Sequence, residues 1–189
     1  MNPCERISYN IHFIYLKKKF RRRSIRLPEY DYSKAGAYFI TICSFNKELI
    51  FAKFNDGKII LTEIGIIVKK HIEEIPKHFE NVFIDEYVIM PNHIHFIISI
   101  VGVQNFEPLQ NEYQKIIPKS VGSIIRAFKG SVTKWCKSNG FKSKLWQRNY
   151  FEHIIRNEED LFRIREYIQN NPLQWELDEE NPKHKNFIR

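Results

Sequence analysis

The chain has 189 residues, 43% of them hydrophobic and 14% aromatic, which fits one folded domain and excludes a disordered polymer. Its 30 Lys and Arg residues against 22 Asp and Glu residues leave a net charge of +8, which favours a polyanionic partner such as nucleic acid. Three cysteines without a CxxC pair argue against a disulfide framework and a thiolate zinc site, and fit a reducing cytoplasm. No apolar run approaches the roughly 20 residues that span a bilayer, so no membrane protein is expected.

The first 26 residues differ from the rest because they end in a dense run of positive charge. The stretch KKKFRRRSIR places six charges between Lys17 and Arg23, and a run of one sign usually stays solvated. Residues 1–26 are therefore expected to form a basic arm that need not be ordered. The arm is either a solubilising extension or a contact to a phosphate backbone, and in the second case Arg22 and Arg23 are candidate contacts.

The next part of the chain alternates between strand-like and helical patterns. Residues 38–45 combine aromatic and β-branched side chains, as strands do. The runs LIFAKF and KIILT flank Asn55-Asp56-Gly57, and Asp-Gly between two such runs predicts a hairpin. Residues 62–79 carry apolar side chains at intervals of three and four, which predicts a helix.

Two more strands and a second helix are expected next. VFIDEYVIM and HIHFIISI are both strand-like and meet at a short turn, Pro91-Asn92. After a polar loop, Ser120 is expected to cap a helix with an apolar face, and Asn139-Gly140 closes that helix.

The last elements complete an α+β order. LWQRNYFEHIIR, from Leu145, predicts a final strand. A helix that starts at Asn157 ends at Asn171, because Pro172 disfavours helical geometry in the residue before it. Together the elements predict a ferredoxin-like sandwich, an antiparallel sheet with its helices packed on one face.

PNHIHF holds the first candidate for chemistry. Side chains alternate along a strand, so His93 and His95 point the same way about 6.6 Å apart while Ile94 points to the other face. Two such imidazoles can converge on one cation, although an isolated pair is more often satisfied by ordinary hydrogen bonds. A divalent ion also needs at least one more nitrogen or oxygen donor from elsewhere in the chain.

The last predicted helix offers that donor and a nucleophile. Tyr167 and Asn171 are four residues apart and share one helix face, beside the apolar stripe that would seat the helix on the sheet. Taken singly, Tyr167 fits a tyrosine at the edge of the core and Asn171 fits a helix C-cap. With the histidines they form the set that tyrosine attack on a phosphodiester requires, because a cation offsets charge on the nonbridging oxygens and favours phenolate.

Five segments occur in a familiar order: LPEYDYSKAGAYFITICSFN, YVIMPNHIHFII, SVGSIIRAFKGSVTKW, LWQRNYFEHIIRN and REYIQNNP. Together they resemble the REP-associated tyrosine transposases, relatives of the single-tyrosine insertion-sequence transposases in the HUH nuclease superfamily. The resemblance covers roughly residues 22–175, and five motifs in order are far more specific than one. It implies a transposase domain over residues 27–175 with the HUH endonuclease fold, followed by a C-terminal tail over residues 176–189.

The resemblance implies metal-dependent cleavage and rejoining of single-stranded DNA at hairpins. In that family the motif that matches His93 and His95 binds Mg²⁺ or Mn²⁺, and the residue that matches Asn171 completes the metal site. The residue that matches Tyr167 becomes joined to a DNA 5′-phosphate. A protein of this kind is expected in the bacterial cytoplasm with the nucleoid, without a membrane partner, as a monomer or a homodimer.

Other residues are candidate DNA contacts. They are Arg126, Lys129, Lys134 and Arg148, with Trp146 and Tyr150 as base-stacking surfaces, although surface lysines often only solvate a helix and tryptophans often pack. Tyr150 is also a rival nucleophile, but it lacks the amide partner of Tyr167. Two alternatives stay open: a hairpin-binding protein without catalysis, and a zinc hydrolase in which Tyr167→Phe would leave activity intact.

Overall fold

The computed structural model describes residues 35–101, 120–178 and 181–182. The expected basic arm, with Arg22 and Arg23, and the polar loop at 102–118 lie outside these residues. In chain order the elements are β1 (Gly36–Cys43), η1 (Phe45–Lys47), β2 (Ala52–Asn55), β3 (Lys58–Leu61), α2 (Glu63–His78), β4 (Val82–Ile89), β5 (His93–Ile100), α3 (Val121–Ser138), β6 (Phe151–Ile155), α4 (Glu158–Asn170) and η2 (Asn171–Leu177).

The main sheet has four antiparallel strands in the order β4-β5-β1-β6. β5 and β1 are central, and their register sets His93 opposite Cys43 and His95 opposite Thr41. β2 and β3 form a separate two-stranded sheet rather than joining the main one. Their turn residues Asp56 and Gly57 both have positive φ, 49° and 74°, which confirms the predicted hairpin and its turn chemistry.

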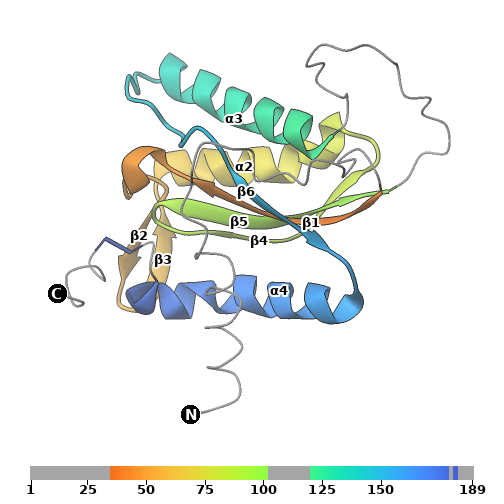
Figure 1. The fold of residues 1–189 in the computed structure, drawn as a ribbon. Helices are drawn as coiled ribbons and strands as arrows, with labels where there is room; N and C mark the ends of the chain where they lie inside the picture. Colours follow the sequence, from red (N-terminus) through yellow and green to blue (C-terminus); the bar gives the residue numbers. More distant parts are fainter. Residues whose placement is uncertain (1–34, 102–119, 179–180, 183–189) are drawn as a thin grey trace. The chain divides into compact units, whose positions relative to one another are not determined.

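The α+β fold with an antiparallel sheet is confirmed, but the expectation that the helices pack on one face is wrong. α2 and α3 cover one face of the sheet, and α4 covers the other (Figure 1). Phe96 of β5 faces α3, where its ring lies 6.0 Å from that of Phe128, while Ile97 packs with Ile164 and Ile168 of α4. β5 is buried along nearly its whole length on both faces, and a strand of that kind needs a layer on each side.

The helices begin at N-caps, of which Ser120 and Asn157 are predicted from the sequence and Thr62 is found in the structure. The side chains of Thr62, Ser120 and Asn157 each accept a hydrogen bond from the backbone N–H three residues later, at 3.1, 3.3 and 2.8 Å. α4 ends at Asn170 with Asn171 as its C-cap, and the chain continues through η2. These caps fix where α4 begins and ends on the sheet, and so where its polar residues lie.

The last strand is shorter than expected. β6 begins at Phe151, and of the preceding residues only Trp146 makes a bridge, to Ser44. Residues 145–150 instead form a connection, in which the side chain of Lys129 donates hydrogen bonds to the backbone carbonyl groups of Gln147 and Asn149. Within the described parts of the chain, no helix is long and apolar enough to cross a membrane.

Candidate active site

His93 and His95 lie side by side on the face of β5 that α4 covers. Their ring centroids are 4.6 Å apart, and both side chains are buried. The intervening Ile94 and the following Phe96 point into the core on the opposite face, as the alternation of the strand predicts. The structure therefore brings two imidazoles together in a place with little access to water.

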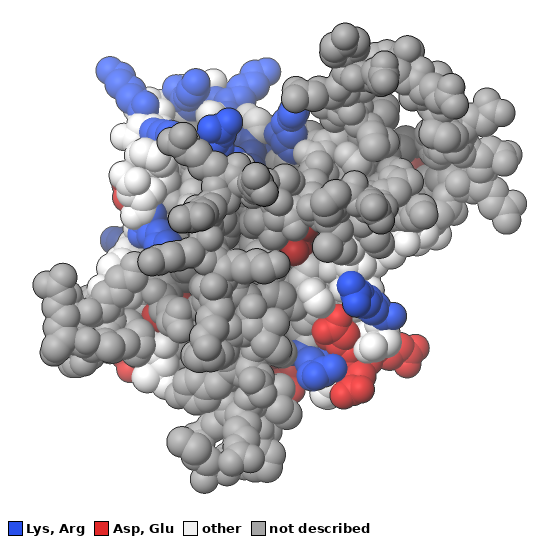
Figure 2. Space-filling model, viewed as in Figure 1, with Lys and Arg blue, Asp and Glu red and all other residues white. Residues whose placement is uncertain are grey.

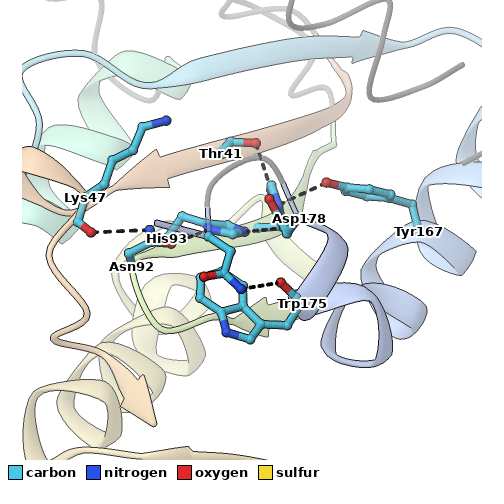
Figure 3. Close-up of polar contacts among 9 residues, drawn as sticks. Thr41, Lys47, Asn92, His93, Tyr167, Trp175 and Asp178 are labelled. Atoms are coloured by element: carbon cyan, nitrogen blue, oxygen red, sulfur yellow. Dashed lines mark hydrogen bonds and ion pairs between the residues drawn. The ribbon is translucent and has the colours of Figure 1, made fainter. Parts of the chain in front are cut away.

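A polar contact orients the ring of His93. Asn92 donates from Nδ2 to the backbone oxygen of Lys47 at 3.3 Å, and this contact fixes which end of the amide faces the ring (Figure 3). The amide oxygen of Asn92 then lies 2.9 Å from Nδ1 of His93, and since an amide oxygen only accepts, Nδ1 must carry the proton. Nε2 of a neutral His93 is left as a lone pair, which is the form that binds a metal.

His95 is held in the same manner by the neighbouring strand. The hydroxyl of Thr41, directly opposite on β1, lies 2.8 Å from Nδ1 of His95. A hydroxyl can donate or accept, so Thr41 orients the ring without fixing its tautomer by itself. In both histidines Nδ1 is engaged by a neighbouring polar group, and Nε2 lies on the side of residues from the C-terminal part of the chain, Asp178 for His93 and Tyr167 for His95.

Tyr167 reaches the histidines from α4. Its hydroxyl oxygen lies 3.4 Å from Nε2 of His95, and the two rings are 5.3 Å apart (Figure 3). The ring of Tyr167 also meets Phe39 edge to face at 6.0 Å, next to the apolar cluster that seats α4 on the sheet. The structure thus places the predicted nucleophile against the nitrogen that would bind a metal.

Asn171 lies one turn beyond Tyr167 and is buried, with 2% of its surface exposed. Its side-chain oxygen has no hydrogen-bond partner among the described residues, which is costly for a buried acceptor. Four residues further on, the ring of Trp175 lies 6.1 Å from that of His93. In the sequence, Asn171 therefore lies midway between Tyr167, which contacts His95, and Trp175, whose ring lies near that of His93.

Asp178 is a residue of this site that sequence reasoning missed. Its carboxylate lies 3.9 Å from Nε2 of His93, and only 7% of its surface is exposed. Asn181 helps to hold Asp178 in this position. The backbone N–H of Asn181 donates to the carbonyl of Asp178, and the side chain of Asn181 donates to the carbonyl of Trp175, both at 2.9 Å. Asp178 follows the last periodic helix, so no spacing in the sequence connects it to His93.

These donors fit a divalent cation in kind. Two imidazole nitrogens, one amide oxygen and a nearby carboxylate are ligand types that Mn²⁺ and Mg²⁺ accept. In the part of the chain that is described, no three side chains of His, Cys, Asp or Glu are grouped closely enough to hold an ion by themselves. The buried oxygen of Asn171, an acceptor without a partner among the described residues, is the observation that supports the fit.

The predicted DNA contacts within the described residues lie away from this site. Lys and Arg side chains gather over α3 (Figure 2). α3 lies on the opposite side of the sheet from α4, and the first turn of α4 is acidic. Arg126, Lys134 and Arg148 are exposed. Arg126 and Lys134 belong to α3, so they lie across the sheet from Tyr167 of α4.

Lys129 and Trp146 have structural surroundings. Lys129 donates from Nζ to the carbonyl of Gln147 at 2.8 Å, and burial lowers the pKa of its ammonium group to about 8. Trp146 is 6% exposed and donates from Nε1 to the carbonyl of Lys129 at 3.1 Å. A ring packed in this way has no open face for a base, which argues against the expected stacking role. Tyr150 is half-buried just before β6.

The fold and the site together define a class of protein: a four-stranded sheet that carries paired histidines on a central strand and a tyrosine on the helix facing them. The family described as "Transposase IS200 like" matches residues 41–171, and this span includes both histidines, Tyr167 and Asn171. The chain belongs to this family of IS200-like transposases.

Individual relatives agree with this assignment. An uncharacterized protein of Haemophilus influenzae is 48% identical over 166 residues, which cover 84% of this chain and 92% of that protein. A second protein of that organism, provisionally named a REP-associated tyrosine transposase, is 28% identical and covers 76% and 74% of the two chains. A solved structure of a REP-associated tyrosine transposase bound to a REP hairpin is similar in fold, with a TM-score of 0.57, 20% identity and coverage of 79% and 74%. Sequence and fold thus bear out the resemblance to the REP-associated branch.

Proposed function

We propose that the protein cuts and rejoins single-stranded DNA beside a hairpin through a covalent bond between Tyr167 and a DNA 5′-phosphate. The observation that carries this proposal is the contact of 3.4 Å between the Tyr167 hydroxyl and Nε2 of His95. The buried oxygen of Asn171, one helical turn after Tyr167, adds a candidate metal ligand. A hairpin substrate is favoured because a similar fold is known bound to a REP hairpin and a relative carries the REP-associated name.

His93, His95 and Asn171 are the residues that would hold Mg²⁺ or Mn²⁺, with the Asp178 carboxylate adding negative charge beside His93. A bound ion would supply positive charge for the phosphate oxygens and for the phenolate. The two imidazoles and the amide are all neutral donors, and Mg²⁺ usually keeps at least one carboxylate in its site. This preference gives Asp178 a chemical reason to be near.

The bonds change in two balanced steps. Tyr167 Oη forms a bond to phosphorus while the bond from phosphorus to the 3′-oxygen breaks, and the proton that the phenol loses is matched by one gained at the 3′-oxygen. In the second step a 3′-hydroxyl attacks the phosphotyrosine, restores a phosphodiester and releases the phenol. Tyr167 and His95 meet within one chain, which supports a site that needs no second copy.

Basic side chains are the residues that we expect to contact the DNA. Exposed Arg126, Lys134 and Arg148 would meet the backbone of the DNA, and Arg22 and Arg23 of the arm keep their proposed role. An association with the nucleoid would follow from such contacts. The positive charge over α3 lies across the sheet from the tyrosine, so these residues would hold a duplex stem rather than the strand that is cut.

The proposal is tested with a hairpin oligonucleotide that has single-stranded flanks, incubated with Mn²⁺ or Mg²⁺ and resolved on a denaturing gel. A 3′ label is expected to move with the protein, while a 5′ label is expected in a shorter free strand. Tyr167→Phe should abolish the adduct, and Tyr150→Phe, which removes the rival hydroxyl, should retain it. An adduct that survives Tyr167→Phe would disprove the assigned nucleophile.

The same gel separates the proposal from its alternatives. Hairpin binding without any adduct from the wild-type protein would favour a DNA-binding protein without catalysis. Cleavage that continues in Tyr167→Phe without an adduct would favour water activated at a zinc site.

A further inference from the structure

A β-bulge in β4 turns two neighbouring acidic residues towards α4. Ile84 pairs with Ile98 and Tyr87 pairs with Phe96, so Asp85 and Glu86 together oppose the single residue Ile97. An extra residue of this kind interrupts the alternation of side chains, and bulges often re-aim a side chain beside an active site. Ile97 faces α4, and both carboxylates are found on that face as well.

Each carboxylate binds one residue of α4. Arg165 donates to Asp85 from Nε at 2.9 Å and from Nη2 to the second carboxylate oxygen, so the guanidinium and the carboxylate meet through two parallel bonds. Gln169 donates from Nε2 to Glu86 at 3.0 Å. Arg165 and Gln169 are one helical turn apart and lie on the same side of α4. Tyr167 lies midway between them in the sequence.

The apolar contacts of α4 do not by themselves fix the tyrosine. Ile164 and Ile168 pack against Phe39 and Ile97, but apolar packing has little directional preference, so a helix seated in this way can shift along its axis. The paired bonds of Arg165 are directional and resist both sliding and rotation. The Tyr167 contact with His95, at 3.4 Å, is at the long end of a hydrogen bond, so a small shift of the helix would break it.

We propose that Asp85 and Glu86 are positioning residues that set the Tyr167 hydroxyl against the histidines, acting through Arg165 and Gln169. The proposal rests on the proposed function for its catalytic readout. A third contact supports it: His153 of β6 lies 2.8 Å from Asp160 in the first turn of α4. The helix is thus held from both edge strands of the sheet, and the bulge supplies the contacts nearest the tyrosine.

Arg165→Met is the test, and Arg163→Met is its matched control. Arg163 lies on the same helix and pairs with Glu159 of that helix at 3.6 Å, so its loss removes an ion pair without detaching α4 from β4. With saturating hairpin and Mn²⁺, Arg165→Met is expected to form the covalent adduct about tenfold to a hundredfold more slowly than the control, as displaced catalytic groups do. Its hairpin affinity and melting temperature should match those of the control, since a role limited to stability would change the melting temperature first.

Two further variants separate position from charge. Arg165→Lys keeps the charge but cannot form the paired bonds, so it should be slow as well. The double variant Asp85→Arg with Arg165→Asp exchanges the partners and should recover most of the lost rate. Adduct formation by folded Arg165→Met or Arg165→Lys at the rate of the Arg163→Met control would overturn the proposal, and the lysine variant decides if the methionine variant does not fold.

Hydrogen exchange gives a readout that needs neither DNA nor metal. Backbone amides around Tyr167 should exchange faster in Arg165→Met than in Arg163→Met. Equal exchange in the two variants would also overturn the positioning role. If the wild-type protein forms no adduct at all, the proposed function fails, and the exchange measurement still decides whether the bulge holds the helix.

Discussion

Asn92→Ala should weaken divalent metal binding although Asn92 is not a proposed ligand. The residue is fully buried, and its side chain contacts Nδ1 of His93 and the Lys47 carbonyl. Without the amide oxygen, the acceptor that holds the proton of His93 on Nδ1 is lost. The ring then also populates the tautomer with a proton on Nε2, which cannot bind an ion.

The size of the effect follows from these contacts. Loss of a partner that orients a metal-binding histidine typically costs 10-fold to 100-fold in metal affinity, or about 1.4–2.8 kcal/mol. The same substitution leaves the buried His93 N–H without its acceptor, which should cost about 1–3 kcal/mol of folding stability. Asn92→Asp keeps an acceptor beside Nδ1 and should preserve most of the metal affinity.

The measurement is a titration of the DNA-free protein with Mn²⁺, in which the free ion is followed by electron paramagnetic resonance. Asn149→Ala is the control, because that side chain is exposed and is not part of the proposed metal site. Wild-type and control affinities should coincide. If folded Asn92→Ala bound Mn²⁺ as tightly as the control, the argument that Asn92 fixes the tautomer of His93 would be wrong.

Three further outcomes are expected. Asp178→Asn should lower Mn²⁺ affinity in the same titration while exposed Glu176→Gln leaves it unchanged, since only Asp178 lies beside His93; equal affinities would remove Asp178 from the site. Trp146→Ala should cost about 3–5 kcal/mol in denaturant unfolding, as loss of a core aromatic does, with the hairpin affinity of the folded protein unchanged; a selective loss of affinity would restore the base-stacking role. The pKa of Lys129 falls from 10.5 to about 8 on folding because of burial, so the unfolded chain binds more protons between these values. The stability of the wild type relative to Lys129→Met should therefore rise as the pH increases through this window, and a flat difference in urea unfolding would contradict that pKa.

Local patterns in the sequence were enough to predict the central parts of the site. Strand alternation set His93 and His95 on one face, and helical spacing set Tyr167 and Asn171 on one face, because both depend only on the geometry of a single element. The capping residues Ser120 and Asn157 also act within a few residues of their own position. Each of these predictions needs no knowledge of what packs against the element.

The features that the sequence did not reveal depend on contacts between distant segments. The side of the sheet that α4 covers follows from the strand order, which no local pattern encodes. Trp146 is surrounded by polar and basic residues in the sequence, yet Phe51 and Phe128 enclose it in the structure. The bulge that turns Asp85 and Glu86 towards one face breaks the alternation on which strand predictions rest.

The two-sided burial of β5 also limits how this strand can vary among related chains. Inserting one residue ahead of His93 would exchange the two faces of β5. Both imidazoles would then point into the apolar core, and isoleucines would face Tyr167. Inserting two would restore the faces but would move His95 away from Thr41 across the sheet. Homologues that keep the chemistry should therefore differ here by substitution and never by length.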